Sequence, residues 1–314
     1  MTVSRPPAFS SSADFVEKIN DADFWRPHVF AALRVHQLDD TDCATLEAGN
    51  NATHPTFICG GVVVKFFGHI PPWRRAYECE RAAQLLIAEN PEITAPRLLA
   101  SGILAGSPHA GWAYLVTTRM RGASCEQAQL PREQMCAIAA ALGAQVKRVH
   151  ALSPGRVATH EDWQPVDIAA ACAHSSLPSH LVPQIDDFLK TLAPFDHVVC
   201  HSDLVANHVY IEDGRLVGII DWGDAMVTDR HGEIIQPYRD LFGCDKQLLR
   251  VFLDASDWPV GKHFHRQALG LALHRQAIGL QQHRSMDVFE PVAARFPLGD
   301  IATLEELASE MFAM

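Results

Sequence analysis

Hydrophobic residues in the first third of the chain occur in short runs that predict β-strands. Residues 46–58 predict a strand, a polar turn and a second strand, and residues 62–67 predict a third strand. Residues 96–102 and 112–118 predict two more. Between these groups, residues 74–90 carry apolar side chains at helical spacing. The pattern therefore predicts a sheet accompanied by a helix.

The chain before and after this region is predicted to be mostly helical. Residues 14–38 predict one or two short helices that break near Pro27, because proline lacks the amide hydrogen of a helical bond. The later helical patterns cover residues 131–150, 168–173, 181–192, 238–253, 265–282 and 304–314.

A predicted hairpin interrupts the helical part. Two runs with strand-like alternation, 209–211 and 216–220, flank Asp213-Gly214, and Asp-Gly is a strong signal for a hairpin turn. Because paired strands lie only ~5 Å apart, this turn would place Asn207 or His208 beside Asp221. A carboxylate and a second ligand would then meet.

Length and composition indicate an ordinary globular protein. The 314 residues suggest about two structural units, and 48% hydrophobic with 20% charged residues can form a sizeable core. No apolar run reaches the ~18 residues of a membrane span, and residues 1–13 lack the apolar segment of a signal peptide. We therefore expect a cytoplasmic protein without a membrane partner. The eight cysteines, without Cys-x-x-Cys spacing, are expected to be free thiols.

Charge narrows the class of ligand. The formal net charge of -11 argues against a nucleic-acid partner, because nucleic-acid binding depends on Lys and Arg neutralising phosphates. The same charge favours a cationic ligand. The histidines and cysteines show no cluster with zinc spacing, so we expect no structural zinc. No feature of the sequence predicts a protein partner.

Acidic residues around the hairpin suit phosphoryl transfer. This reaction needs Mg²⁺ bridging the phosphates and a residue that orients the attacking hydroxyl. Asp203 would accept the proton of the substrate hydroxyl, while Asp221 and a neighbour would hold Mg²⁺. His201 would brace the loop by hydrogen bonding to the backbone. The simpler interpretation is a surface hairpin whose aspartates only form turns, but an apolar hairpin that ends in Ile-Asp-Trp-Gly-Asp-Ala argues against it.

Two neighbouring segments read His201-Ser-Asp-Leu-Val-Ala-Asn-His208 and Ile219-Ile-Asp-Trp-Gly-Asp-Ala225. Together they resemble the aminoglycoside phosphotransferase family, whose members are small-molecule relatives of protein kinases. One position departs from the kinase loop His-x-Asp-x-x-x-x-Asn, because His208 stands at the metal-binding Asn and Asn207 comes one residue early. The Asn-His pair is similar to the gentamicin 2''-phosphotransferase branch, where the histidine occupies the metal position. The resemblance thus implies His208 as metal ligand ahead of Asn207, although imidazole is a less usual ligand for Mg²⁺.

The resemblance also implies residues that bind the nucleotide. Val62-Val-Val-Lys65 is similar to the Val-Ala-Ile-Lys strand of kinases, whose lysine holds the α and β phosphates and pairs with a helix glutamate. Glu80 would be that partner, with Glu78 as the alternative; otherwise Lys65 would simply point outward from a half-exposed strand. The other implied residues are Asn51 and Thr53 in a phosphate loop, and Thr118, Arg119 and Met120 at the hinge that meets the base.

The implied fold is a two-lobed, protein-kinase-like α+β protein. A nucleotide-binding lobe, residues 1–118, would contain the antiparallel sheet plus helix, and a mostly helical lobe, residues 119–314, would carry catalysis and substrate binding. Asp224 and Asp229 would line the substrate pocket, with a structural role for Asp229 as the alternative.

The implied reaction moves the γ-phosphate of ATP or GTP to a hydroxyl of a small molecule, most simply an aminoglycoside antibiotic in a resistance enzyme. A metabolite kinase acting on a sugar or an amino alcohol is the alternative of the same fold. A nucleotide-binding protein without transferase activity is a third hypothesis, and intact Lys65, Asp203 and Asp221 argue against it.

Overall fold

The computed structural model describes residues 6–38, 43, 45–49, 53–71, 73–104, 111–159, 167–281 and 287–314. Contacts divide the chain into two units, Met1–Arg121 with Asp221–Asp224, and Gly122–Ile220 with Ala225–Met314. Segment 221–224 thus packs with the first unit, although its neighbours in the sequence belong to the second. The assignment of a nucleotide-binding role to residues 1–118 and a catalytic role to residues 119–314 stays a prediction.

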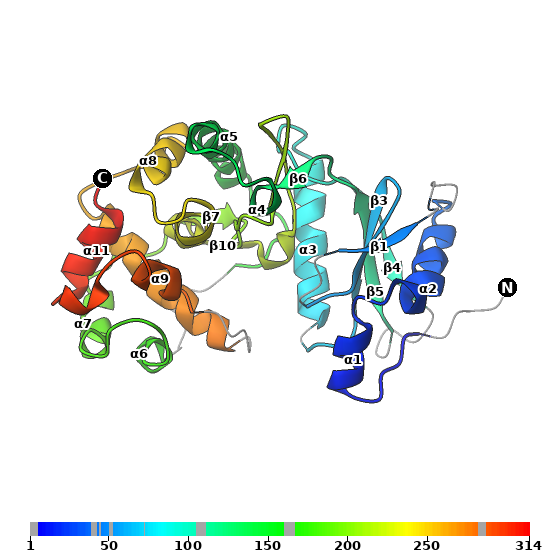
Figure 1. Cartoon of the computed structure of the whole chain (residues 1–314), viewed down its shortest axis with the longest axis horizontal. Coiled ribbons are helices and arrows are strands. Elements are labelled where there is room, and N and C mark those ends of the chain that lie inside the picture. Colours follow the sequence, from blue (N-terminus) through cyan, green and yellow to red (C-terminus); the bar gives the residue numbers. More distant parts are fainter. Residues whose placement is uncertain are drawn as a thin grey trace. The chain divides into compact units, whose positions relative to one another are not determined.

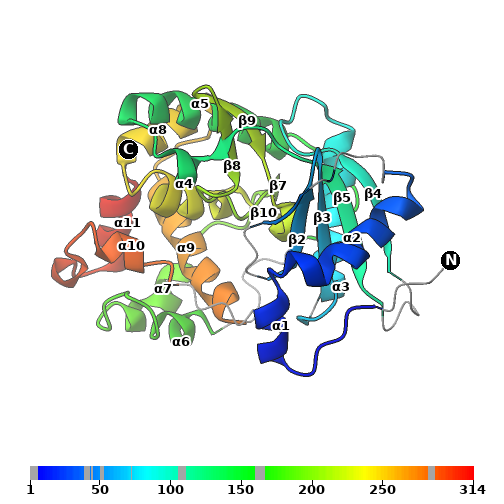
Figure 2. The same ribbon diagram turned by 45° about the vertical axis from the view of Figure 1, so that its right-hand side comes forward.

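An antiparallel sheet forms the centre of the first unit, with strand order β1-β2-β3-β5-β4. Helix α3 (Trp73–Ala88) lies on one face of this sheet and α2 (Ala22–Val35) on the other (Figures 1 and 2). This arrangement confirms the strands and the helix expected from the hydrophobic pattern. The strands are β1 (Leu46–Ala48), β2 (Thr56–Cys59), β3 (Val62–Phe67), β4 (Leu98–Ile103) and β5 (Ala113–Thr118).

Strand β3 shows how the sheet separates its two faces. Successive side chains of a strand point to opposite faces. Phe66 belongs to the core that contains Trp25 of α2, whereas Phe67 packs against Tyr77 of α3. Lys65 is two residues from Phe67, so its side chain lies on the α3 face of the sheet.

The N-terminal helices are separated at a different place from the predicted one. Helix α1 (Ser12–Lys18) ends before Asp21, whose side chain accepts hydrogen bonds from the first amides of α2. Pro27 lies inside α2, so the predicted break near this residue is wrong. A proline near the start of a helix removes only one helical hydrogen bond, and the burial of Trp25 and Val29 in the core holds α2 together across it.

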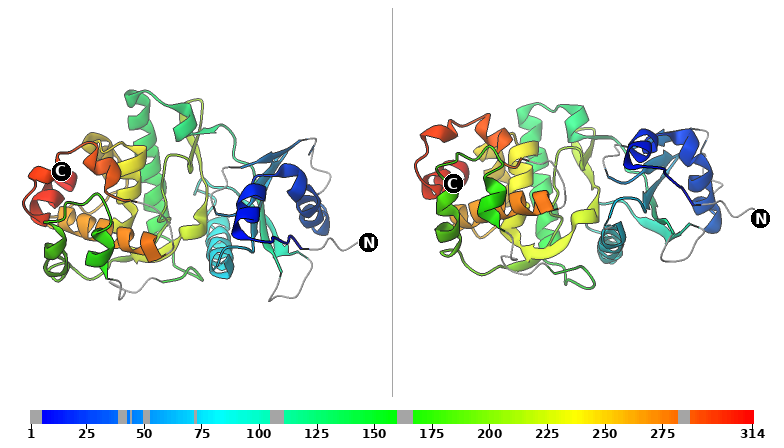
Figure 3. Two further views of the ribbon diagram at one scale, coloured as in Figure 1. Left: turned by 60° about the horizontal axis from the view of Figure 1, so that its bottom comes forward. Right: turned by 90° about the horizontal axis from the view of Figure 1, so that it is seen from below.

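Helices make up most of the second unit, as predicted. Helix α5 packs along α8 (Figure 3), and α9 contacts both α6 and α11. Among the described residues, none of the helices has the length and apolarity that a membrane crossing requires. The α-helices are α4 (Cys125–Ala128), α5 (Arg132–His150), α6 (Ile168–Cys172), α7 (Ile185–Leu189), α8 (Lys246–Ala255), α9 (Phe264–Gln281), α10 (Glu290–Ala293) and α11 (Leu304–Phe312).

Short 3₁₀ or π turns connect these helices. Residues 238–253 were predicted as one helix, but the chain turns at Gly243 and Cys244, whose φ angles are 55° and 62°. A left-handed residue cannot continue an α-helix, so the helical pattern is split between η4 and α8. The short turns are η1 (Val182–Gln184), η3 (Arg230–Glu233), η4 (Pro237–Leu241) and η5 (Leu298–Asp300), and η2 (Trp222–Asp224) belongs to the first unit.

The predicted hairpin is formed by β8 (Val209–Glu212) and β9 (Arg215–Ile219), with β6 (Ala123–Ser124) at the edge of β8. Asp213 and Gly214 have φ angles of 51° and 71°, as the favoured two-residue hairpin turn requires. The amide of Ile220 donates to the carbonyl of His208 at 2.9 Å. The hairpin prediction is therefore confirmed as far as Ile220, the residue before Asp221.

A second pair of strands was missed by the hydrophobic pattern. Strand β7 (His197–Cys200) pairs antiparallel with β10 (Met226–Asp229). Each has only four residues, and a run this short gives little periodic signal. The pairing joins segments that are separated in the sequence by the β8–β9 hairpin.

Cys43 and Cys59 form a disulfide bond. The expectation that all eight cysteines are free thiols is therefore wrong for this pair. Cys59 is paired with Leu46 across β1 and β2, which brings the segment just before β1 close to β2. Sequence spacing alone could not reveal this contact, because it depends on the register of the strands.

Candidate active site

The loop between β7 and β8 carries the predicted phosphoryl-transfer residues. Its backbone turns sharply at Ser202, whose φ of 68° lies in the left-handed region. This conformation is costly for a residue with a side chain and persists only where the surroundings enforce it. The carboxylate of Glu233 accepts hydrogen bonds from the amides of His201 at 2.7 Å and Ser202 at 2.9 Å. A buried acid therefore fixes the chain immediately before Asp203.

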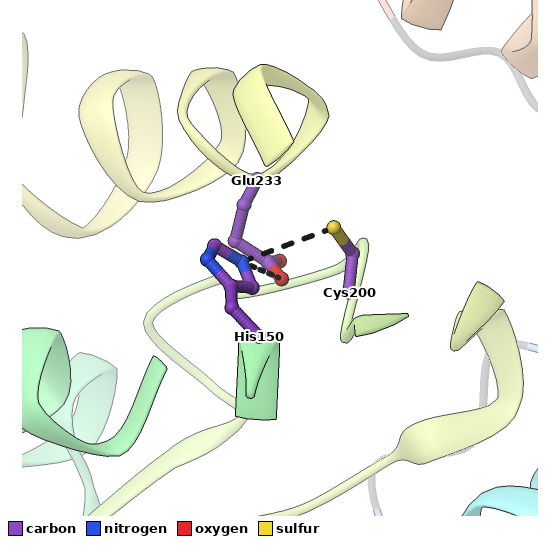
Figure 4. A group of neighbouring side chains, drawn as sticks. All are labelled: His150, Cys200 and Glu233. Carbon is purple, nitrogen blue, oxygen red and sulfur yellow. Dashed lines mark hydrogen bonds and ion pairs between the residues drawn. The ribbon is translucent and has the colours of Figure 1, made fainter. Parts of the chain in front are cut away.

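His150 and Cys200 accompany Glu233 beside this loop (Figure 4). The Nε2 atom of His150 lies 3.9 Å from Glu233 Oε2 and 3.9 Å from Cys200 Sγ. Two ligands of one tetrahedral zinc ion would be only roughly 3.5 Å apart, and both Glu233 oxygens already accept amides. Burial raises the pKa of the Cys200 thiol well above its usual range. We interpret this group as support for the loop and not as a metal site.

His201 braces the loop through both ring nitrogens. Its Nδ1 accepts from the amide of Asp203 at 3.2 Å, and its Nε2 donates to the carbonyl of Ile220 at 2.9 Å. This pair of bonds requires the neutral tautomer with hydrogen on Nε2. Burial agrees with that state, because it lowers the pKa of His201 below its ordinary value.

Asp203 is held by side chains from two other elements. Gln236 Nε2 donates to Asp203 Oδ1 at 2.8 Å, and Arg275 Nη2 donates to the same oxygen at 3.1 Å. The second oxygen, Oδ2, lies 3.6 Å from His208 Nδ1. Gln236 and Arg275 escaped the sequence analysis because neither belongs to a recognisable motif. Glu233 escaped it as well.

His208 and Asn207 both have the chemistry of a cation ligand. The Nδ1 of His208 donates to the carbonyl of Asp203 at 2.8 Å, so in the neutral ring the lone pair is on Nε2, as in many metal-binding histidines. The Oδ1 atom of Asn207 is buried without a hydrogen-bond partner, which is costly unless a donor or a cation satisfies it. These residues therefore fit a metal site, and the choice between them stays a prediction.

The first unit contains a second charged group, formed by Lys65, Glu80 and Asp221. The ammonium of Lys65 lies 2.8 Å from Glu80 Oε2 and 2.8 Å from Asp221 Oδ1. Burial alone would lower the pKa of Lys65, but the carboxylates of Asp221 and Glu80 outweigh it and raise the pKa above its ordinary value. Lys65 therefore points inward, and Glu80 is its partner, not the alternative Glu78.

Asp221 is the most accessible member of this group. Its side chain is 41% exposed, compared with 14% for Lys65 and 6% for Glu80. Its φ of 59° places it in the left-handed region, a strain that is often found where a side chain must be aimed at a functional site. Gly223 follows closely, and a Cβ at that position would lie 3.3 Å from Glu80 Oε2.

The two predicted substrate residues differ in position. Asp224 is half-buried and belongs to the first unit. Its negative charge adds to the burial that raises the pKa of Glu80. Asp229 is 1% exposed, and its oxygens accept from two backbone amides and from the side chains of His231 and Gln267. These bonds hold β10 and η3 in place, and the substrate role of Asp229 stays a prediction. The structural alternative fits its position.

The predicted nucleotide residues outside this group are less informative. Asn51 lies outside the described residues, and Thr53 precedes β2. The hydroxyl oxygen of Thr118 accepts from an amide beside β4 at 2.9 Å, and the amide of Arg119 donates to the turn between β2 and β3 at 2.8 Å. Met120 is half-buried just beyond them. The Thr118 oxygen and the Arg119 amide thus already have partners within the sheet, and contact of these residues with a base stays a prediction.

Known proteins are similar to this chain in sequence and in fold. A model of the phosphotransferase enzyme family, APH, matches residues 47–262. An aminoglycoside 3'-phosphotransferase of Streptomyces fradiae is 29% identical over 148 residues, which are 41% of this chain and 53% of that protein. A hygromycin-B 4-O-kinase of Escherichia coli is 24% identical over 162 residues, 44% of this chain and 47% of that protein. The chain thus spans about half the length of the curated relatives it matches.

A solved structure extends the similarity to most of the chain. The GDP and kanamycin complex of APH(2")-IIia has a TM-score of 0.62 at 16% identity, covering 90% of this chain and 99% of that one. This likeness shows a kinase-like α+β fold. Because the family model matches more than half of the sequence, the chain belongs to the phosphotransferase enzyme family.

Proposed function

We propose that this protein transfers the γ-phosphoryl group of ATP or GTP to a hydroxyl of a small molecule. The observation that carries the proposal is the placement of the Lys65 ammonium 2.8 Å from Glu80 and 2.8 Å from Asp221. A buried lysine oriented by a helix glutamate, next to an accessible aspartate, is the arrangement that kinases use for phosphates and metal. The family match and the GDP in the similar structure support a nucleotide donor.

Each residue then has a role. Lys65, oriented by Glu80, would hold the donor phosphates. Asp221 with His208 or Asn207 would hold Mg²⁺, which would supply positive charge to offset the negative charge that develops during transfer. Asp203 would receive the proton of the acceptor hydroxyl as that oxygen bonds to phosphorus and the bond to the nucleoside diphosphate breaks.

An aminoglycoside is the acceptor that we propose. The two curated relatives are named for aminoglycoside and hygromycin phosphorylation, and the similar structure contains kanamycin. Aminoglycosides carry several ammonium groups, and a protein with a net charge of -11 attracts such cations in a salt-dependent way. We assign to Asp224 the attraction of an ammonium group of the acceptor.

A coupled assay for nucleoside diphosphate release tests the proposal. The purified protein would be given ATP or GTP, Mg²⁺ and each member of an aminoglycoside panel, with sugars and amino alcohols as neutral or singly charged alternatives. We expect release with one or a few aminoglycosides and weaker acceptor binding at high salt. Release with a neutral metabolite alone would replace the antibiotic acceptor by a metabolite, and no release with any acceptor would contradict transferase activity.

Expression in a susceptible bacterium gives an independent test. The wild type should raise resistance to the same aminoglycosides that are phosphorylated in the assay, and Asp203→Asn should not. Equal resistance in the two strains, at equal protein levels, would show that any protection does not come from phosphoryl transfer.

A further inference from the structure

Within the part of the chain that the structure describes, two side chains donate to the carboxylate of Asp203, and both bind the same oxygen. Gln236 and Arg275 both donate to Oδ1, at 2.8 Å and 3.1 Å. His208 Nδ1 lies 3.6 Å from the other oxygen, Oδ2, and donates instead to the main-chain carbonyl of Asp203 at 2.8 Å. The two oxygens of this carboxylate are therefore in different environments.

Both donors are rigidly placed. Gln236 is 2% exposed, and its Oε1 accepts from Arg239 Nε at 2.9 Å. Because a primary amide accepts on oxygen and donates on nitrogen, this bond from Arg239 fixes the amide with its NH₂ group toward Asp203. Arg275 is 7% exposed and comes from α9, whose neighbouring residues Leu271, Ala272 and Leu273 are also buried. Neither side chain can swing away without disrupting its own packing.

Arg275 lies outside the part of the chain that the family model covers. That model ends at residue 262, whereas Asp203 and Gln236 lie inside it. The guanidinium on the predicted base is thus supplied by a helix that the family match does not include.

We propose that Arg275 and Gln236 are positioning residues that hold Asp203 through Oδ1 and so present Oδ2 to the acceptor hydroxyl. The inference rests on the proposed phosphoryl transfer and assigns the reacting oxygen. The proton of the acceptor hydroxyl goes to Oδ2, the acceptor oxygen bonds to the γ-phosphorus, and the bond from phosphorus to the departing nucleoside diphosphate breaks. Two donors on one oxygen restrict rotation of the carboxylate, which keeps Oδ2 aligned with the hydroxyl.

Kinetics of Arg275 variants test the assignment. Arg275→Met should lower kcat by about 10²-fold, the effect expected when a reacting group is displaced by about 1 Å, while KM for the nucleotide stays unchanged. Arg275→Lys retains a charged donor and should recover most of kcat. Gln236→Leu, which removes the other donor to Oδ1, should also lower kcat without changing KM for the nucleotide. Wild-type kcat in Arg275→Met would overturn the assignment.

Arg266 provides the matched control on the same helix. It forms an ion pair with Glu305 at 2.9 Å and a hydrogen bond with Thr191 at 2.7 Å, and it has no assigned part in the reaction. Arg266→Met should lower Tm and leave kcat unchanged. A loss of kcat equal to that of Arg275→Met would mean that any lost arginine in α9 disturbs the enzyme, and the positioning role would be rejected.

A double-mutant cycle separates this inference from the proposed function. Thermal unfolding of the wild type, Asp203→Ala, Arg275→Met and the double variant needs no turnover. We expect the double variant to lose less Tm than the sum of the two single losses, because either change already breaks the pair. Additive losses would overturn the positioning role even if transfer occurs. If the Tm losses are coupled but the protein phosphorylates no acceptor, the contact between Asp203 and Arg275 is supported and the proposed reaction is rejected.

Discussion

Two charged groups, one in each unit, differ in their balance of acidic and basic side chains. In the first unit one ammonium, Lys65, is paired with two carboxylates, Glu80 and Asp221. In the second unit one carboxylate, Asp203, accepts from one guanidinium and one amide. The first group therefore has an excess of negative charge, whereas the second has one charge of each sign.

This difference indicates what each group can bind. A group in which two acids surround one lysine, with one acid accessible, attracts a further cation such as Mg²⁺. A carboxylate that already has a cation on one oxygen gains less from binding another. The Lys65 group is therefore suited to metal and phosphates, and the Asp203 group to orienting a hydroxyl. The predictions below test this division of work.

The largest effect is expected at Asp221. Asp221→Ala should lower turnover by at least about 10³-fold, because a bound metal ion contributes several kcal/mol of charge stabilisation. Lys65→Ala should instead mainly raise KM for the nucleotide. Circular dichroism should show that both variants remain folded. Full turnover in Asp221→Ala would remove the metal-binding role from the Lys65 group.

Asp203→Asn should lower kcat by ~10² to 10⁴, the usual contribution of a general base, while acceptor and nucleotide binding stay nearly intact. The amide keeps an oxygen that can accept from Arg275 and Gln236, so the variant should fold normally. Isothermal titration with the acceptor and steady-state kinetics measure the two quantities separately. Loss of binding with kcat retained would make Asp203 a binding residue.

His208 and Asn207, which lie beside the Asp203 group, are the two alternative metal ligands, and variants of each can distinguish them. We expect His208→Ala to raise the Mg²⁺ concentration needed for half-maximal rate by about 10- to 100-fold, the scale of disturbances to metal sites. Asn207→Ala should raise it much less. The opposite order would assign the metal to the buried oxygen of Asn207.

Acid should loosen the second unit's loop more than the first unit's group. Burial lowers the pKa of His201 below 6.5 in the folded protein. As the pH falls, the unfolded chain therefore binds a proton at His201 before the folded protein does. The stability that neutral His201 contributes is present above pH 6.5 and is lost as the pH falls toward the pKa of His201 in the folded protein. Despite burial, the nearby His150 and the hydrogen bonds from the loop amides lower the pKa of Glu233 below its ordinary value, which adds a loss of stability at lower pH. One such proton changes stability by at most about 1.4 kcal/mol per pH unit.

The Lys65 group gives the internal control for this pH dependence. Burial raises the pKa of Glu80 above its ordinary value, so the folded state takes up that proton more easily than the unfolded chain, and acidification does not lower stability through Glu80. Hydrogen-exchange protection factors, which correct for the slower intrinsic exchange in acid, should therefore fall between pH 7 and pH 5.5 more at residues 201–203 than at residues 62–67. Equal changes in the two segments would contradict this difference.

Local sequence was sufficient where a pattern repeats or a turn has a specific chemistry. The run of β-branched and aromatic residues at 62–67 predicted β3, and Asp213-Gly214 predicted the hairpin because few residues adopt positive φ easily. The contact between Lys65 and Glu80 followed from a family resemblance, and helical spacing could not exclude Glu78. Pro27 was misjudged because packing of α2 outweighs one missing hydrogen bond.

The sequence by itself determined the chemical groups of the candidate site, a lysine and two aspartates, and their order along the chain. Only the tertiary structure decided which atoms meet. Arg275 lies 72 residues after Asp203 in the sequence, and Glu233 lies 31 residues after Ser202, whose amide it binds. Contacts over such separations leave no periodic signal, because they depend on how whole helices pack and not on the spacing of neighbouring residues. The orientation of Asp203 is therefore a property of the folded second unit.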